Sequence, residues 1–381
     1  MRLIKIFKRN EKGSITLMVL AAMIFVLVVI TASYFAISNK SGNQDKKISK
    51  IAQQYRASDE DMDQEYQKVV SNLKVEDYVK VGDYVDYNPT IATKDGQNVD
   101  ANKLTYTSQT GTATEHGNGY TSAEEGGGQT FTANSNIKWR VLSIDDGNVE
   151  LISEDIIKTD SGENFILMGA RGYLYIEQEL NEICKIYGYG YGADTTKGGT
   201  YTTGGPIDTP ITGKIEGTGA RSITIEDINK KAGITEADYT TLNSSYGSTT
   251  NPPSNVYYPT VDINKGDSIT GISNSAGVKE LKDTFYMYSG SRIKNTNVKS
   301  ILLNGTYWLA SRYISTSNEG GYFYSRYMNN EGVKVSDLCY GFSYHFSEST
   351  KRSGIRPVVT IKAEAIDLSI NYDKDNIWRL K

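Results

Sequence analysis

The side chains that could act as nucleophiles, bases or metal ligands are few and scattered in this sequence. Its 381 residues include two histidines, His116 and His345, and two cysteines, Cys184 and Cys339. His116 lies in a Gly/Thr-rich stretch and His345 lies among aromatic residues, so neither has the neighbours of a catalytic triad or a zinc site. The glycine-rich runs lack the flanking strand and helix that form a phosphate-binding loop. We therefore expect no catalytic residue, no metal and no cofactor.

A second set of residues is suited to binding. Tyr occurs 28 times, and near the C-terminus the tyrosines are interspersed with Ser, Asn and Gly. Tyr gives a large contact area at low entropy cost, while the small polar residues adapt to a ligand. Alternation along strands would place several of them on one face. The competing interpretation is that they are ordinary half-buried strand residues, because aromatic residues favour strands. The candidate ligand-binding residues are Tyr313, Tyr322, Tyr324, Tyr327, Tyr340, Tyr344 and His345.

Structural residues are predicted on either side of this run. The segment 305–312 (GTYWLASR) is expected to fill core and rim, and the segment 354–361 (GIRPVVTI) to form an apolar strand opened by proline. The arginines of the two segments are expected to pair with buried carboxylates or to cap backbone carbonyls. The predicted structural residues are Trp139, Trp308, Arg312, Arg356 and Pro357.

Several regular elements are expected around these segments. Residues 137–144 and 149–153 alternate apolar and polar residues around an Asp-Gly turn, which predicts a β-hairpin with Trp139 on or near the core. Helical spacing covers 173–187. A further helix is expected from Thr224, its N-cap, to Lys231, with Gly233 as its stop.

The remaining segments are expected to be less regular. Residues 75–90 predict a strand and a turn. Residues 91–130 and 188–218 are rich in Gly, Thr and Ser, which favours solvated surface loops. The tail is expected to add a last strand over 366–372, and Trp378 is expected to pack on the domain.

The two cysteines have apolar or aromatic neighbours. A free cysteine in such company is usually a small buried hydrophobe, so we favour two buried thiols. One long-range disulfide between Cys184 and Cys339 is the alternative.

The N-terminus has the charge pattern of a membrane anchor. Residues 1–13 carry five basic residues against one acid, and residues 14–37 carry no charge. A helix of this uncharged length is roughly 36 Å long and covers a hydrocarbon core of ~30 Å. The basic flank places everything after residue 38 outside the cell by the positive-inside rule. An apolar stripe then continues along 39–74, which predicts an amphipathic stalk helix; a coiled-coil dimer is the alternative.

Composition excludes one class of partner. The net charge is −4 and the isoelectric point is near 5.5, with both signs scattered through the chain. Nucleic acid binding requires a basic field, so no nucleic acid partner is expected.

The segment 12–17 (KGSITL) resembles the type IV prepilins, in which a basic leader ends in Gly before a Thr-Leu pair and an apolar helix. The resemblance implies cleavage after Gly13 by a prepilin peptidase, N-methylation of Ser14, and packing with other pilin subunits. The Glu that the family has at the fifth mature position is Met18 here, which removes an ion pair that would register subunits in a filament. An uncleaved anchor is the alternative.

The C-terminal part resembles a second family. The segments 305–312, 320–347 and 354–361, with 138–157 and 219–234, resemble a domain of unknown function on surface proteins of Gram-positive gut bacteria. More distantly, they resemble the C-type-lectin-like fold shared by formylglycine-generating enzymes and retroelement-diversified variable proteins. The resemblance covers about residues 130–362.

These expectations combine into one prediction. The fold class is α+β: a transmembrane and amphipathic N-terminal helix precedes a mixed, mainly antiparallel β domain with short helices, which the resemblance makes C-type-lectin-like. The expected protein is a single-pass membrane protein that crosses the cell membrane through 14–37. Its extracellular domain is expected to bind a glycan or protein. If it assembles with other pilin subunits, it is located in a surface pilus. The alternatives are a purely structural minor pilin or pseudopilin, and a surface enzyme. The expected parts are 1–13 (basic leader), 14–38 (membrane helix), 39–74 (stalk), 75–136 (strand and loop insertion), 137–362 (surface domain) and 363–381 (tail).

Overall fold

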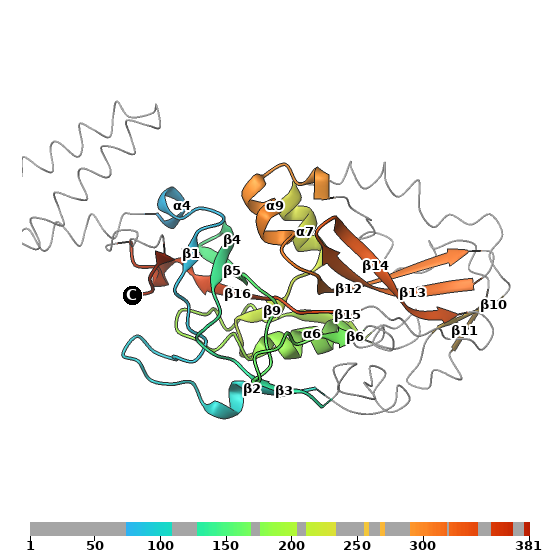
Figure 1. Cartoon of the computed structure of the whole chain (residues 1–381), viewed down its shortest axis with the longest axis horizontal. Coiled ribbons are helices and arrows are strands. Elements are labelled where there is room, and N and C mark those ends of the chain that lie inside the picture. The colour runs from blue at the N-terminus through green and yellow to red at the C-terminus, as the bar shows by residue number, and fades with distance from the viewer. Residues whose placement is uncertain are drawn as a thin grey trace, which may run out of the picture. The chain divides into compact units, whose positions relative to one another are not determined.

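The computed structural model describes residues 74–108, 128–168, 176–203, 211–233, 255–258, 267–270, 290–317, 320–341, 352–368 and 377–381 (Figure 1). Nearly all of them belong to one compact unit, Val75–Asp367 with Tyr372–Lys381, which includes the predicted insertion and most of the predicted tail. The other unit, Met1–Lys74 with Leu368–Asn371, is almost wholly outside the described residues. The predicted leader, membrane helix and stalk lie there, as do Gly13 and Ser14. Among the helices that the structure describes, none is long and apolar enough to span a membrane.

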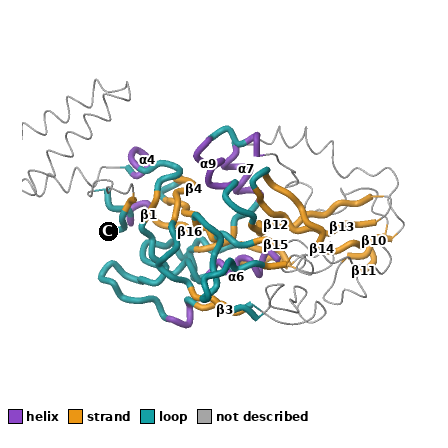
Figure 2. Tube along the Cα trace, in the orientation of Figure 1, coloured by secondary structure: helices purple, strands orange, loops and turns teal. Residues whose placement is uncertain are grey.

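The described unit is a mixed, β-rich domain with a few short helices, which confirms the α+β class (Figure 2). Its largest sheet has six strands in the order β17-β1-β4-β5-β16-β9. Only the β1–β17 pair is parallel among the pairs of this sheet, and it joins the two ends of the described unit. The strands are β1 (Tyr84–Val85), β4 (Trp139–Asp145), β5 (Asn148–Ser153), β9 (Ala220–Ser222), β16 (Pro357–Lys362) and β17 (Ile377–Trp378).

The β4–β5 hairpin forms where the Asp-Gly turn predicts it. Asp145 pairs with Asn148, so Asp146 and Gly147 are the two loop residues, and both have positive φ, 49° and 73°. Such a two-residue turn matches the twist of the strands that it joins. Trp139 opens the hairpin and is buried, as predicted.

A second sheet has three strands, β12 (Tyr307–Ser317), β13 (Gly320–Asn329) and β14 (Gly332–Gly341), all antiparallel. It contacts helix α6 (Ile176–Lys185) and helix α7 (Ile225–Ala232) through β12. Four two-stranded pairs complete the strands: β2 (Thr105–Thr107) with β3 (Thr130–Thr132), β6 (Leu167–Met168) with β15 (Arg352–Ser353), β7 (Thr200–Thr203) with β8 (Ile211–Lys214), and β10 (Asn255–Tyr258) with β11 (Asp267–Thr270).

Helix α7 forms as its sequence predicts. Thr224 is the N-cap and, with Asp227, makes a reciprocal capping box, while Gly233 ends the helix with φ 68°. Helix α6 lies inside the predicted 173–187 segment. The described residues also form the short helices α4 (Val75–Tyr78) and α9 (Thr296–Leu302) and the 3₁₀ turns Ala101–Lys103, Gly290–Arg292 and Ala363–Ala365.

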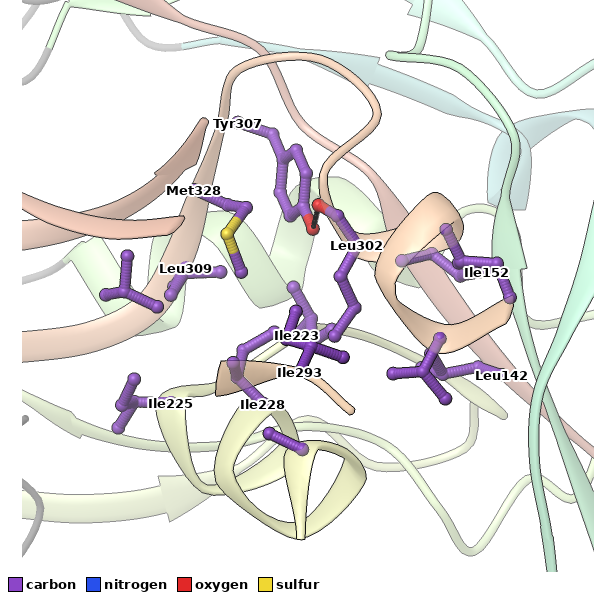
Figure 3. Packing of buried hydrophobic residues seen from close by; sticks show 14 of the residues in the cluster. Leu142, Ile152, Ile223, Ile225, Ile228, Ile293, Leu302, Tyr307, Leu309 and Met328 are labelled. Carbon is purple, nitrogen blue, oxygen red and sulfur yellow. Dashed lines mark hydrogen bonds between the residues drawn. The ribbon is translucent and has the colours of Figure 1, made fainter. Parts of the chain in front are cut away.

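One buried cluster joins both sheets and the two helices α7 and α9 (Figure 3). Burying a side chain of this kind contributes about 1.5–3 kcal/mol, so the cluster ties the base of the three-stranded sheet to the rest of the domain. Its members include Leu142 and Ile152 of the six-stranded sheet, Ile225 and Ile228 of α7, Ile301 and Leu302 of α9, and Tyr307, Leu309, Met328 and Val333 of the three-stranded sheet.

Three sequence predictions about irregular segments are wrong. Residues 75–78 form helix α4 instead of a strand, and strand β1 follows only at Tyr84. The described part of the segment 91–130 is not purely a solvated loop, because Val99 and Leu104 are buried and β2 pairs with β3. The segment 188–218 contains the β7–β8 pair and packs tightly: a Cβ on Gly190 would lie 2.4 Å from the Asn88 carbonyl oxygen.

The structure describes only part of the tail. Residues 363–365 form a 3₁₀ turn, Ile366 forms an isolated bridge with Leu380, and β17 is the last strand described. Most of the strand predicted over 366–372 lies outside the described residues. Trp378 does pack on the domain as predicted, and its Nε1 donates to Asp83 Oδ2 at 2.9 Å. Cys184 is free and buried, so the predicted buried thiol is confirmed for it and the disulfide alternative is wrong.

Candidate functional site

The candidate site is the three-stranded sheet that carries the tyrosine-rich run. Strand register pairs Tyr324 with Tyr313 on β12 and with Asp337 on β14, and it pairs Tyr322 with Tyr340. Because positions alternate between the two faces of a strand, Tyr322 and Tyr324 occupy the same face of β13. The register therefore brings together four of the seven predicted binding positions. Tyr344 and His345 lie outside the described residues.

Tyr327 occupies a different place from the other tyrosines. It is three positions from Tyr324 on β13, which puts it on the opposite face. Its ring contacts Trp308 in a T-shaped arrangement with 5.8 Å between ring centroids, and it is only half-buried. An edge-to-face pair of this kind contributes about 0.5–1.5 kcal/mol beyond its buried area. Tyr327 therefore has a structural contact that the sequence did not indicate.

The base of the sheet is built from the predicted structural residues. Tyr307, Trp308 and Leu309 are fully buried. The Tyr307 hydroxyl donates to the Leu302 carbonyl at 2.7 Å (Figure 3). Trp308 Nε1 donates to the Leu167 carbonyl at 2.9 Å. These bonds satisfy the polar ends of two large aromatic side chains, as burial requires. The predicted core role of this segment is confirmed.

Strand β12 is also fastened to α7 through a register shift between Trp308 and Arg312. In this interval the Ala310 N–H donates to the Ile223 carbonyl at 2.9 Å. The Ser311 hydroxyl accepts from the Ile225 N–H, also at 2.9 Å. The irregularity thus redirects the polar groups of β12 toward the start of α7, which is the usual effect of a bulge.

Arg312 and Glu177 join the sheet to helix α6. Glu177 Oε1 accepts from the backbone N–H of Arg312 at 3.2 Å and lies 3.8 Å from its guanidinium Nε. The other oxygen, Oε2, accepts from the Thr202 N–H at 2.7 Å. Burial raises the pKa of Glu177 in spite of the attraction to Arg312. The prediction that Arg312 pairs with a buried carboxylate is confirmed.

Arg356 takes the other predicted role and caps backbone carbonyls. Its Nε and Nη2 donate to the Ser153 carbonyl, and its Nη1 donates to the Ile301 carbonyl at 2.6 Å. Its guanidinium also lies 5.0 Å from the centroid of the Tyr307 ring. Burial lowers the pKa of Arg356. The adjacent Pro357 is buried and is the first residue of β16, where a missing N–H is tolerated.

A cluster of charges fastens α7 to the six-stranded sheet. Arg221 of β9 contacts Glu150 at 2.6 Å and Asp227 at 2.5 Å, and Lys231 contacts Glu150 at 2.6 Å. Burial alone would raise the pKa of Glu150, but Arg221 and Lys231 hold it at about 2. This cluster is structural, since each carboxylate in it has a cationic partner. No sequence motif indicated it.

The described residues contain no group of three His, Cys, Asp or Glu side chains that could hold a metal ion. Burial raises the pKa of the Cys184 thiol far above its usual value, which opposes a nucleophilic role. The arrangement that remains is a polar aromatic sheet with a firmly packed base.

Comparison with family models, with curated proteins and with solved structures found no match for this chain. The pilin-like and lectin-like resemblances therefore remain predictions from the sequence.

Proposed function

We propose that this protein is a pilin-like, membrane-anchored surface protein that displays a tyrosine-rich sheet for binding an extracellular glycan or protein. The anchor is the uncharged segment 14–37, and the binding surface is the outer part of β12, β13 and β14. The C-type-lectin-like character of the domain belongs to the same proposal.

The observation that carries the binding function is the pairing of tyrosine positions across three strands. Tyr313, Tyr324 and Asp337 form one row, and Tyr322 with Tyr340 forms another. Clustered tyrosines on a fixed backbone lose little entropy on binding, which favours affinity. The buried base at Tyr307 and Trp308 supplies the fixed backbone. A ligand surface of this kind needs no catalytic group.

The anchor follows from the sequence alone. A basic leader before an uncharged, membrane-length helix favours retention in the membrane with the remainder outside. The prepilin-like segment around Gly13 and Ser14 adds processing by a prepilin peptidase to the proposal. Met18 in place of the family's Glu favours a displayed subunit over one that fills the body of a filament, because the registering ion pair is lost.

A purely structural pilin subunit is the second candidate. The same N-terminal segment favours it, since packing with other pilin subunits would use residues 14–37 and need no ligand. The two candidates differ in the role of the tyrosines.

The anchor is tested by intact mass and N-terminal sequencing of the chain from its native membrane fraction. We expect recovery with membranes and a first residue of Ser14, methylated on its amine. A chain that keeps residues 1–13 in the membrane would remove the pilin-like processing and leave a plain anchor. A chain absent from membranes would contradict the anchor itself.

The binding function is tested with cells that produce the full chain, applied to arrays of glycans and of extracellular-matrix proteins. We expect retention on one ligand class relative to cells without the chain. Equal retention of both cell types on every surface would instead favour the purely structural subunit.

A further inference from the structure

A small hollow is lined by residues other than the tyrosines of the three-stranded sheet. Its volume is about 280 Å³, and it is lined by Asp155, Ile156, Lys158, Asn164, Asn304 and Gly305. These residues come from the loop after β5 and from the turn that leads into β12. The hollow is slightly smaller than the roughly 300 Å³ at which pockets for drug-sized ligands begin. Its size suits a molecule no larger than an amino acid.

Two residues of opposite charge line the hollow. Asp155 and Lys158 are exposed, and within the described part of the chain neither side chain makes an ion pair or a hydrogen bond. Other charges are used: Glu150, Asp227 and Lys231 all have partners within 2.6 Å. A carboxylate and an ammonium group are thus both available at one small site.

The frame of the hollow is held by hydrogen bonds between segments that are far apart in the sequence. Asn304 Nδ2 donates to the Glu154 carbonyl at 2.7 Å, and the Asn304 carbonyl accepts from Arg356 Nη1 at 3.2 Å. On the other wall the Ile157 N–H donates to the Ile355 carbonyl at 3.0 Å. Gly305 has φ 86° and leaves room beside Ile156, whose Cδ1 would lie 3.6 Å from an added Cβ. A ligand would therefore meet a preformed site, which lowers the entropy cost of binding.

We propose that this hollow binds a small zwitterion. The ligand's ammonium group would pair with the Asp155 carboxylate and its carboxylate with the Lys158 ammonium, while the Asn164 and Asn304 amides supply further polar contacts. A neutral sugar fits less well, because no aromatic ring lines the hollow for stacking and both charges would stay unpaired. This site is independent of the tyrosine-rich surface and goes beyond the proposed function.

The test is ligand-observed saturation-transfer NMR on the full chain in detergent micelles. The probes are glycine, β-alanine and γ-aminobutyrate, whose charges are separated by increasing lengths, together with acetate, methylammonium and glucose. We expect saturation transfer to at least one of the zwitterions. Acetate and methylammonium, each with one charge, should bind about tenfold more weakly, because each forgoes one charge-assisted contact.

Two variants locate the binding. Asp155→Asn and Lys158→Gln should each weaken zwitterion binding about tenfold. Both side chains are exposed, so the unfolding midpoint should not change. The matched control, Lys94→Gln with Asp95→Asn, removes an exposed charge of each sign elsewhere and should leave binding as in the wild type.

Three results would overturn the proposal: no saturation transfer to any zwitterion, a stronger effect for glucose than for every zwitterion, or equal binding by wild type and both variants. Because Tyr324→Ala changes only the other surface, it should leave this binding unchanged. Failure of the tyrosine-rich surface to bind a ligand would not affect the outcome here.

Discussion

The two main sheets of this domain differ in their residue types and in the role of those residues. In the six-stranded sheet, β16 is buried over its first five residues, and β5 contributes Val149, Leu151 and Ile152 to the core. In the three-stranded sheet the core residues that the structure describes lie at the base. Farther out, the register pairs tyrosines with each other and with Ser or Asp, and it pairs Ile314 with Phe323. The first sheet therefore supplies stability, and the second carries side-chain types suited to recognition on a base that the first sheet holds.

Arg356 and Arg312, which link the three-stranded sheet to the rest of the domain, also differ from each other in the groups that they contact. Arg356 satisfies uncharged carbonyls of the six-stranded sheet and of α9, whereas Arg312 faces the carboxylate of Glu177. Of these two arrangements, only the second contains a carboxylate, and burial raises the pKa of that carboxylate.

The largest effect should come from removing the aromatic base. Trp308→Ala should lower the free energy of unfolding by about 3–5 kcal/mol, because it empties a fully buried site. Trp139→Ala in the six-stranded sheet should cost a similar amount, since that side chain is also buried. Urea unfolding of the full chain followed by circular dichroism measures both. A Trp308→Ala protein with an unchanged midpoint would mean that the Trp308 side chain does not anchor the base of the three-stranded sheet.

Arg356→Met should destabilise by about 2–4 kcal/mol. The methionine leaves the Ser153 and Ile301 carbonyls without their donors, and each buried unsatisfied group costs about 1–3 kcal/mol. Arg356→Lys should recover only part of this loss, because an ammonium cannot reach both carbonyls in the geometry of a guanidinium. If Arg356→Met were as stable as the wild type, the carbonyl cap would not hold the junction.

Acid should weaken the link between α7 and the six-stranded sheet. The pKa of Glu150 is about 2 in the folded protein against 4.5 ordinarily, so the unfolded chain binds more protons between these values. The stability that Glu150 contributes, on the order of 2–3 kcal/mol, is present above about pH 4.5 and is lost as the pH falls to about 2. Glu177 acts in the opposite direction, because burial raises its pKa and protonation then favours the folded state.

This prediction is tested by comparing the wild-type protein with the variant Glu150→Gln. The difference in unfolding free energy between wild type and variant should be large at pH 7 and should shrink toward pH 2. A difference that does not change with pH would show that Glu150 is not held ionised by Arg221 and Lys231.

The smallest expected effect is a difference in stability between alanine variants of two tyrosines on β13. Tyr327→Ala should destabilise by about 1–2 kcal/mol, because it removes the edge-to-face contact with Trp308. Tyr324→Ala should cost less stability than Tyr327→Ala, since its position is on the other face of β13. The reverse order, measured by thermal unfolding, would break the assignment of the two faces.

Local signals predicted much of the fold. Three confirmed predictions depend on neighbours within a few residues: the N-cap at Thr224, the Asp-Gly hairpin turn and the apolar strand at Val358–Val359. The wrong predictions concern residues whose structure depends on partners far away in the sequence. Gly190 looks like a solvated loop residue in sequence, yet it must be Gly because Asn88 lies against it.

The candidate site divides in the same way. The sequence identified the tyrosines and the two arginines, but not the register that pairs Tyr313 with Tyr324 and separates Tyr327 from them. Glu177, Asp155 and Asn164 gave no signal, because each acquires its role from a segment more than a hundred residues away, Arg312 in one case and Asn304–Gly305 in the others.

The most direct test of the account is ligand retention by cells that produce a Tyr313→Ala, Tyr324→Ala double variant, compared with wild type and with Tyr327→Phe. These two tyrosines form one paired row on the sheet. We predict that the double variant loses retention on the surface that holds wild-type cells, while Tyr327→Phe keeps it. Full retention by the double variant, present at the wild-type level on the cells, would contradict the proposed binding surface.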